Sequence, residues 1–306
     1  MKIYTITLNP AFDVHAGAER LVVGRENLAC VTSRDAGGKG INISRALSEN
    51  GIENTAIAVL GRENSADFKA LLDEYGINYV AIAKEGRIRE NLTFHTEGGE
   101  TRISFSGFSL DSSVLCEVEA YIEADSDTVV TFTGSVPRGV DISECKSFLK
   151  GLRAKGVRVV IDSKSFTIED LIEVKPWLIK PNGEEISVYF GSEVEYFDDC
   201  KLLAHRLCES GIDNVMISLG EKGAMLVSSE GAFVAEPPAV DAISTVGAGD
   251  STIAGFIAAF GEGKSAEECL TRAVSFGTAA CLSEGTAPPR ASDVADIFEK
   301  VRVFVL

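Results

Sequence analysis

The chain has 306 residues, of which 45% are apolar and 25% charged, so it can bury a sizeable core and is not a disordered chain. Its formal net charge of −17 argues against nucleic acid or an anionic membrane as a partner. Seven scattered cysteines without a C-x-x-C pair predict reduced thiols rather than a metal site. Residues 3–8 are too short an apolar run for a signal peptide, so we expect a cytoplasmic protein.

Strand-like and helical segments alternate along the first two thirds of the chain. The strand-like segments are Ile3–Leu8, Thr55–Leu60, Thr128–Phe132, Val157–Ile161, Trp177–Ile179 and Val215–Leu219. The helical segments are Lys39–Asn50, Ser65–Tyr75, Ser112–Ala124, Ser143–Lys155 and Tyr196–Glu209. This alternation predicts an α/β fold of βαβ units, with a mainly parallel central sheet and helices on both of its faces.

One region interrupts the alternation and predicts a separate layer of β structure. Glu90–Phe94 and Thr101–Phe105 flank a glycine-containing turn and read as a hairpin, to which the strand-like Leu28–Ser33 can add. A two-stranded hairpin alone is marginally stable. We therefore expect a small β lid, built from about residues 13–34 and 88–108, that packs on a ligand, the main domain or a second subunit.

The last third of the chain is predicted to be helical, over residues 249–260, 266–282 and 292–301. No internal repeat or long linker divides the sequence. Residues 1–306 are therefore expected to form one domain that carries the lid.

The segment Gly37–Asn42 is a glycine-rich turn that opens a predicted helix. Lys39 and Asn42 are three residues apart, so they share one helix face, where a cation and an amide suit a charged, oxygen-rich ligand. The alternative is an ordinary glycine turn with a solvated lysine. The spacing is neither that of a Walker A loop nor that of a Rossmann fingerprint.

A second glycine turn, Thr245–Ser251, leads into an apolar helix rich in small residues. Gly247, Ala248 and Gly249 can direct backbone N–H groups into one space, and the helix adds the positive end of its dipole. Asp250 at the rim can take a proton from an attacking hydroxyl group. The alternative is that Asp250 only caps the helix.

Seven motifs occur in one order along the whole chain. They are Thr7–Asp13, Gly37–Asn42, Arg89–Asn91, Gly134–Pro137, Lys180–Asn182, Ser218–Gly220 and Val246–Ser251. Together they resemble the PfkB (ribokinase-like) carbohydrate kinase family, in its branch of 1-phosphofructokinase and tagatose-6-phosphate kinase. The resemblance implies a three-layer αβα sandwich with a β lid, and a homodimer through that lid. It also implies ATP and Mg²⁺, with a monovalent cation as a further candidate.

The resemblance also implies a role for each matching residue. Asp250 corresponds to the catalytic base, with Gly247, Ala248 and Gly249 around the anion hole. The implied substrate contacts are Asp13, Gly38, Lys39, Asn42, Arg89 and Asn91, with Arg138 as a further phosphate contact. The implied nucleotide contacts are Asn182, Glu185, Ser218, Gly220, Gly223 and Gly249, with Glu185 holding Mg²⁺ through water.

Several of these residues have a structural alternative. Asn182 and Glu185 have the spacing of a helix capping box, Asp13 can be a turn residue, and Arg89 can be a solvated strand charge. Two segments depart from the branch. Asp162-Ser163-Lys164-Ser165 stands where Asp-Thr-Ser-Gly is usual, and residues 106–110 replace a turn that contains Gly-Pro. Both departures leave the exact sugar open.

The implied reaction is the ATP-dependent phosphorylation of a sugar phosphate to a sugar bisphosphate. Fructose 1-phosphate is the first candidate substrate and tagatose 6-phosphate the second, and an unphosphorylated sugar or nucleoside is a third option. A non-catalytic sugar-phosphate sensor and a nicotinamide oxidoreductase are the alternatives from other functional classes.

Overall fold

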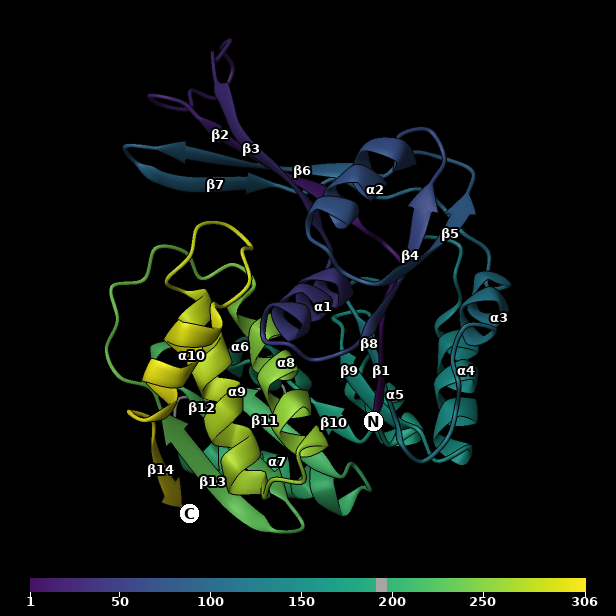
Figure 1. Ribbon diagram of the computed structural model, residues 1–306, viewed down its shortest axis with the longest axis vertical. Helices are drawn as coiled ribbons and strands as arrows, with labels where there is room; N and C mark the ends of the chain where they lie inside the picture. Colours follow the sequence, from purple (N-terminus) through teal and green to yellow (C-terminus); the bar gives the residue numbers. More distant parts are fainter. Residues whose placement is uncertain (191–196) are drawn as a thin grey trace.

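A large mixed sheet forms the centre of the molecule (Figure 1). The structure is a computed structural model that describes residues 1–190 and 197–306. Its strands are β1 (Lys2–Thr7), β4 (Thr55–Gly61), β5 (Tyr79–Lys84), β8 (Thr128–Thr133), β9 (Arg158–Asp162), β10 (Leu178–Ile179), β11 (Asn214–Ser218), β12 (Ala224–Ser228), β13 (Gly231–Glu236) and β14 (Arg302–Val305). Within the described residues their order is β14-β13-β12-β11-β10-β9-β8-β1-β4-β5. Pairing is parallel from β5 to β11 and antiparallel from β11 to β14.

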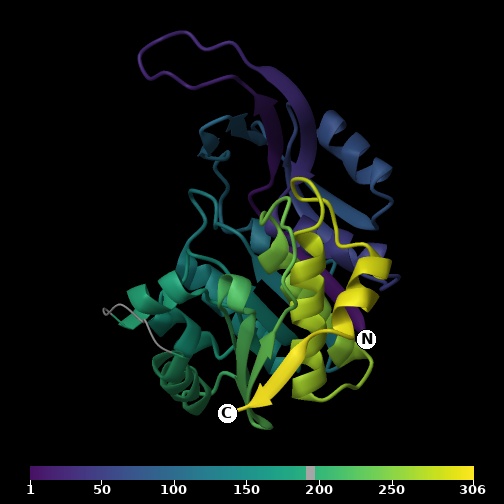
Figure 2. The ribbon, with the colours of Figure 1, turned by 90° about the vertical axis from the view of Figure 1, so that its left-hand side faces the viewer.

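Helices cover both faces of this sheet (Figure 2). One layer contains α1 (Lys39–Glu49), α8 (Ala248–Gly261), α9 (Ala266–Ala280) and α10 (Ala291–Phe298). The other contains α3 (Val114–Glu119), α4 (Ile142–Ala154), α5 (Ile168–Val174), α6 (Gly183–Phe190) and α7 (Phe197–Glu209). Successive side chains of a strand point to opposite faces. On β9, Val159 and Ile161 therefore pack into one core and Val160 into the other.

A separate four-stranded sheet projects beyond the main body (Figure 1). Its strands are β2 (Ala11–Gly17), β3 (Cys30–Gly37), β6 (Arg89–Thr96) and β7 (Gly99–Ile103), in the order β3-β2-β6-β7. We call it the small sheet. The part of this sheet that carries Phe12 packs on α2 (Ser65–Glu74). There the rings of Phe12 and Phe68 meet edge to face, with their centroids 5.1 Å apart.

The α/β class, the two helix layers, the mainly parallel sheet and the separate small sheet confirm the predicted fold class. The predicted helices at residues 39–50 and 65–75 each end one residue earlier, at Glu49 and Glu74. For the helix predicted from Tyr196, α7 begins at Phe197, and Tyr196 lies outside the described residues.

The three helices predicted in the last third are present as α8, α9 and α10, but that third also contains strands that were not predicted. Strands β12 and β13 form a tight antiparallel hairpin, and β14 joins its outer edge near the C-terminus. These strands are short, and β14 pairs with a segment some seventy residues earlier in the chain. In the described ranges, no helix is long and apolar enough to cross a bilayer.

Helix α1 lies close against β1 because Gly40 has no side chain. A Cβ atom at Gly40 would lie 2.5 Å from Thr7 Oγ1 and 2.7 Å from the Ile6 carbonyl oxygen. Such distances are far inside van der Waals contact, so only glycine fits without a shift of the backbone. This approach fixes the start of α1 beside the carboxyl end of β1.

We expect Gly40→Ala to lower the free energy of unfolding by about 1–3 kcal/mol, because the added methyl group overpacks the contact with β1. Gly151 in α4 is the matched control, since a Cβ atom there meets nothing within 4 Å. Gly151→Ala should raise the free energy of unfolding by about 0.5–1 kcal/mol through helix propensity. Urea unfolding measures the free energy of unfolding of each variant. Equal changes in the two variants would contradict the close approach of α1 to β1 at Gly40.

Candidate active site

A cavity of about 610 Å³ lies at the carboxyl edge of the parallel strands. Its floor includes Thr7, Thr133 and Asp162, the last residues of β1, β8 and β9. The small sheet contributes to the opposite wall with Asp13, Asn91 and other polar residues. Ligands of open α/β sheets bind outside the carboxyl ends of the strands, so the topology itself favours a binding site here.

Asp250 enters this cavity from the first turn of α8. The turn before the helix depends on Gly247, whose φ of 82° lies in the left-handed region that favours glycine. The Asp250 side chain is buried, and its Oδ2 accepts a hydrogen bond of 2.8 Å from Asn42 Nδ2 on α1. Gly247 and Gly249 line the same cavity. A carboxylate therefore lies beside the end of a helix where N–H groups lack partners within the helix.

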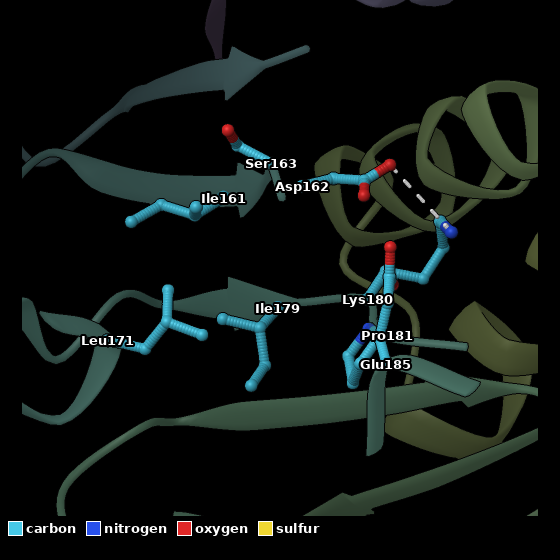
Figure 3. Close-up of a pocket in the computed structure, with 8 residues that line it drawn as sticks. All are labelled: Ile161, Asp162, Ser163, Leu171, Ile179, Lys180, Pro181 and Glu185. Carbon is cyan, nitrogen blue, oxygen red and sulfur yellow. Dashed lines mark ion pairs between the residues drawn. The ribbon is translucent and has the colours of Figure 1, made fainter. Parts of the chain in front are cut away.

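A second buried carboxylate, Asp162, lies between two lysines. Lys39 Nζ donates to Asp162 Oδ2 at 2.8 Å, and Lys180 Nζ is 3.8 Å from the same oxygen (Figure 3). Burial alone would raise the pKa of Asp162, but Lys180 and Lys39 hold it below the ordinary value. Burial pulls the pKa of Lys39 down, yet Asp162 and Asp250 raise it above its ordinary value. Asp162 and Lys39 therefore form a charged pair near neutral pH.

The same surroundings raise the pKa of Asp250 to about 6. Burial is the main cause, and the charge of Asp162 adds to it. Lys39, the hydrogen bond from Asn42 and Lys180 act in the opposite direction. A carboxyl group in this range is ionised at neutral pH and still basic enough to take a proton.

The wall formed by the small sheet is built around Asp13. Its Oδ1 accepts hydrogen bonds from Asn91 Nδ2 and Arg102 Nη2, both at 3.0 Å. A Cβ atom at Gly37 would lie 2.0 Å from Asp13 Oδ2, so glycine is needed for the carboxylate to lie there. Asp13 is thus buried in a network of hydrogen bonds rather than exposed as a turn residue.

Arg89 connects the small sheet to the main body. Its guanidinium donates to the carbonyl oxygens of Phe105 at 3.0 Å and Asn9 at 3.2 Å. Burial lowers the pKa of Arg89. The charge of Asp13 raises this pKa, whereas the charge of Arg102 lowers it further. Two guanidinium groups close together create a site that favours an anion.

Five oxygens of residues that line this cavity are buried without a hydrogen-bond partner among the described residues. They are Thr7 Oγ1, Asn9 Oδ1, Asn42 Oδ1, Asn91 Oδ1 and Thr133 Oγ1. Buried polar atoms are normally satisfied, and leaving one unpaired is unfavourable. These five oxygens are closed to solvent, so they lie behind the surface of the cavity and do not identify a ligand.

The residues predicted for the nucleotide lie beside this cavity. Asn182 and Glu185 form a reciprocal capping box: Asn182 N donates to Glu185 Oε2 at 3.0 Å, and Glu185 N donates to Asn182 Oδ1 at 2.8 Å. Glu185 also lines a small second cavity that shares Asp162 and Lys180 with the large one (Figure 3). Ser218 pairs with Asn182 across the sheet, and Gly220 and Gly223 follow Ser218 in the next turn.

Arg138 is the predicted site residue that lies elsewhere. It is exposed, does not line the cavity, and donates to the Gly107 carbonyl oxygen at 3.4 Å.

Three residues of the site, Asp162, Lys180 and Arg102, were assigned no role from the sequence. Asp162 ends a strand, and Lys180 directly follows the next strand of the sheet. That position at the carboxyl edge is the signal that could have identified both.

The fold and this site define a phosphotransferase that acts on a hydroxyl group, with a buried carboxylate, a helix N-terminus and several cations around one cavity. Residues 15–293 match the family model described as pfkB family carbohydrate kinase. The chain belongs to the pfkB family of carbohydrate kinases, and use of ATP follows from that membership.

Curated relatives cover most of the chain. It is 32% identical to a 1-phosphofructokinase of Haemophilus influenzae over 99% of this chain and 98% of the relative. It is 35% identical to a 1-phosphofructokinase of Escherichia coli K12 over 84% of this chain and 83% of the relative.

A solved relative has the same fold throughout. Phosphofructokinase-2 from Escherichia coli, crystallised with substrates and products, matches with a TM-score of 0.91 and 29% identity over 98% of this chain and 99% of its own. Other crystal structures of that protein contain potassium or fructose 6-phosphate, and one is a tetrameric inhibited form.

We expect Asp250→Asn to stabilise the fold at alkaline pH. The folded pKa of about 6 exceeds the ordinary 3.8, so above pH 6 the folded state carries the penalty of a buried charge. Asparagine removes that charge and keeps an oxygen for Asn42. The variant should gain about 1–3 kcal/mol at pH 8, and the gain should shrink toward pH 4, where the carboxyl is protonated in the folded state and only partly ionised in the unfolded state.

Urea unfolding of both proteins at pH 8 and pH 4 measures this difference. A variant that is less stable than the parent at pH 8 would contradict the raised pKa.

Proposed function

We propose that the protein is a 1-phosphofructokinase, which transfers the γ-phosphoryl group of ATP to fructose 1-phosphate and yields fructose 1,6-bisphosphate and ADP. The position of Asp250 is the observation that carries this proposal: a buried carboxylate with a pKa near 6 faces a polar, cationic cavity from a helix N-terminus. The names of the curated relatives support the choice of sugar.

Asp250 acts as the general base. The acceptor hydroxyl gives its proton to a carboxylate oxygen of Asp250 as its oxygen forms the new bond to phosphorus, while the bond between phosphorus and the bridging oxygen of ADP breaks. Asn42 holds Asp250 Oδ2 at 2.8 Å, which orients the other oxygen. The N–H groups around Gly247 and Gly249 stabilise the charge on the transferring group.

The sugar phosphate binds between the small sheet and the sheet edge. Arg89 and Arg102 hold its existing phosphate, because a pair of guanidinium groups can bind one oxyanion with several hydrogen bonds. Asn42 and Asn91 line the cavity and offer their side-chain amide groups to the sugar hydroxyls. Closure of the small sheet over the cavity excludes water, which limits hydrolysis of ATP.

Mg²⁺ fits the nucleotide side of the site. The described residues contain no group of three or more His, Cys, Asp or Glu side chains that could hold a metal. Mg²⁺ is commonly bound by one or two carboxylates, several waters and the phosphates of the substrate. Glu185 would hold it through water, and the ion would neutralise phosphate charge. A monovalent cation is the further candidate, which the potassium complex of the solved relative supports.

The assembly and the compartment are part of the same proposal. Val31 and Ile103 of the small sheet, and Leu28 just before β3, are exposed apolar side chains, which supports a homodimer through this sheet. All seven cysteines lie in the described residues and are free, which supports a reducing, cytoplasmic environment.

Fructose 6-phosphate is a second candidate substrate, because the solved relative from Escherichia coli binds it. The same arginine pair can hold a phosphate at either end of the sugar. The choice between the two substrates depends on which hydroxyl then reaches Asp250.

A panel of sugars in an assay coupled to ADP release tests the function. We expect fructose 1-phosphate to have the highest kcat/KM, with weaker turnover of fructose 6-phosphate and tagatose 6-phosphate. Unphosphorylated fructose and a nucleoside are the controls and should be poor substrates. Turnover of unphosphorylated sugars alone would contradict the roles of Arg89 and Arg102, and binding without ADP release would indicate a sensor.

Replacement of the base tests the mechanism. Asp250→Asn should lower kcat by about 10²–10⁴-fold with little change in nucleotide affinity, because amide groups accept no proton. In the parent enzyme, kcat at saturating substrate should fall as pH drops below about 6, where Asp250 becomes protonated. Asp296→Asn, an exposed change on α10, is the control. Normal turnover by a folded Asp250→Asn protein would rule out Asp250 as the general base.

A further inference from the structure

Lys164 lies two residues beyond β9, at a position where the sequence departs from the usual pattern of its branch. Its Nζ is 3.7 Å from Glu185 Oε1, and its side chain lines the large cavity. The Lys164 side chain is 74% exposed, whereas that of Glu185 is only 18% exposed. A flexible cation therefore lies at the boundary between the large cavity and the residues predicted for the nucleotide.

The other cations that line the cavity are already engaged within the protein. Lys39 and Lys180 share the buried carboxylate of Asp162, and Arg102 pairs with Asp13. Arg89 donates to two backbone carbonyl oxygens. Within the described residues Lys164 has a single ion pair, which is long and in which the lysine itself is exposed, and such pairs contribute little stability. It can therefore exchange that partner for a stronger anion with little loss.

The charge of Lys164 already acts on the centre of the site. It is one of the groups that lower the pKa of Asp162, after Lys180 and Lys39. A flexible ammonium group at this place can contact the phosphates of a nucleotide held near Glu185, because lysine binds phosphate as a compact point charge with a long reach.

We propose that Lys164 is a positioning residue for the nucleotide, and that its ammonium group moves from Glu185 to a phosphate oxygen when the nucleotide enters. The exchange places one more positive charge on the phosphate chain and releases Glu185 Oε1. This inference rests on the proposed function, since it takes the nucleotide side of the cavity from that proposal.

Calorimetry with the non-hydrolysable analogue β,γ-imido-ATP tests the inference independently of turnover. We expect Lys164→Met to weaken binding of the analogue, and to raise the KM for ATP, by roughly tenfold or more, because a charge-assisted contact is lost. The KM for the sugar phosphate should stay within about twofold. Lys164→Arg keeps the charge and should stay close to the parent protein.

Lys264→Met is the matched control, because it removes a surface ion pair of 3.6 Å, with Glu268, on another part of the molecule. Equal affinities for the analogue in the parent protein, Lys164→Met and Lys264→Met would overturn the inference and leave Lys164 as a solvated surface charge. Loss of analogue affinity in Lys164→Met alone would support it. This binding result would support the role of Lys164 even if the protein turned over no sugar phosphate. Absence of turnover would contradict only the proposed function.

Discussion

A buried carboxylate between two lysines joins the elements that carry the candidate catalytic centre. Asp162 ends β9, Lys39 begins α1 and Lys180 directly follows β10, so three separate segments meet at one oxygen. An isolated charge would be very unfavourable at this depth, whereas a charge with close partners is tolerated. The same charges also act on Asp250, so the interaction that holds the segments together helps to set the proton affinity of the base.

The polar oxygens around the cavity follow from the same arrangement. Thr7 and Thr133 end strands of the sheet and Asn42 lies in the first turn of α1, so regular backbone structure fixes the place from which each side chain enters. These residues make the cavity polar before any ligand binds. Preorganised groups of this kind need little rearrangement when a substrate with matching hydroxyl groups enters.

Local patterns in the sequence were sufficient to predict most of the parallel strands, though not β5, and the two glycine turns that open α1 and α8. Those turns also indicated Lys39, Asn42 and Asp250, because each lies in the first turn of a helix that a glycine turn opens. The antiparallel strands β12, β13 and β14 were missed, since β14 depends on a partner far away in the chain. Arg102 was missed for a similar reason: only the pairing of β6 with β7 and β2 brings it to Asp13.

The small sheet and the catalytic centre are joined by almost no intervening chain. Strand β3 ends at Gly37 and α1 begins at Lys39, so Gly38 is the only residue between them. Gly38 has a φ of 139°, and a Cβ atom there would lie 2.6 Å from Thr7 Cγ2. Of the four places where the chain passes between the small sheet and the main body, this is the shortest, and its next residue is the lysine bound to Asp162. A swing of the small sheet that bends this connection therefore displaces Lys39, and with it the positive charge beside Asp162 and Asp250.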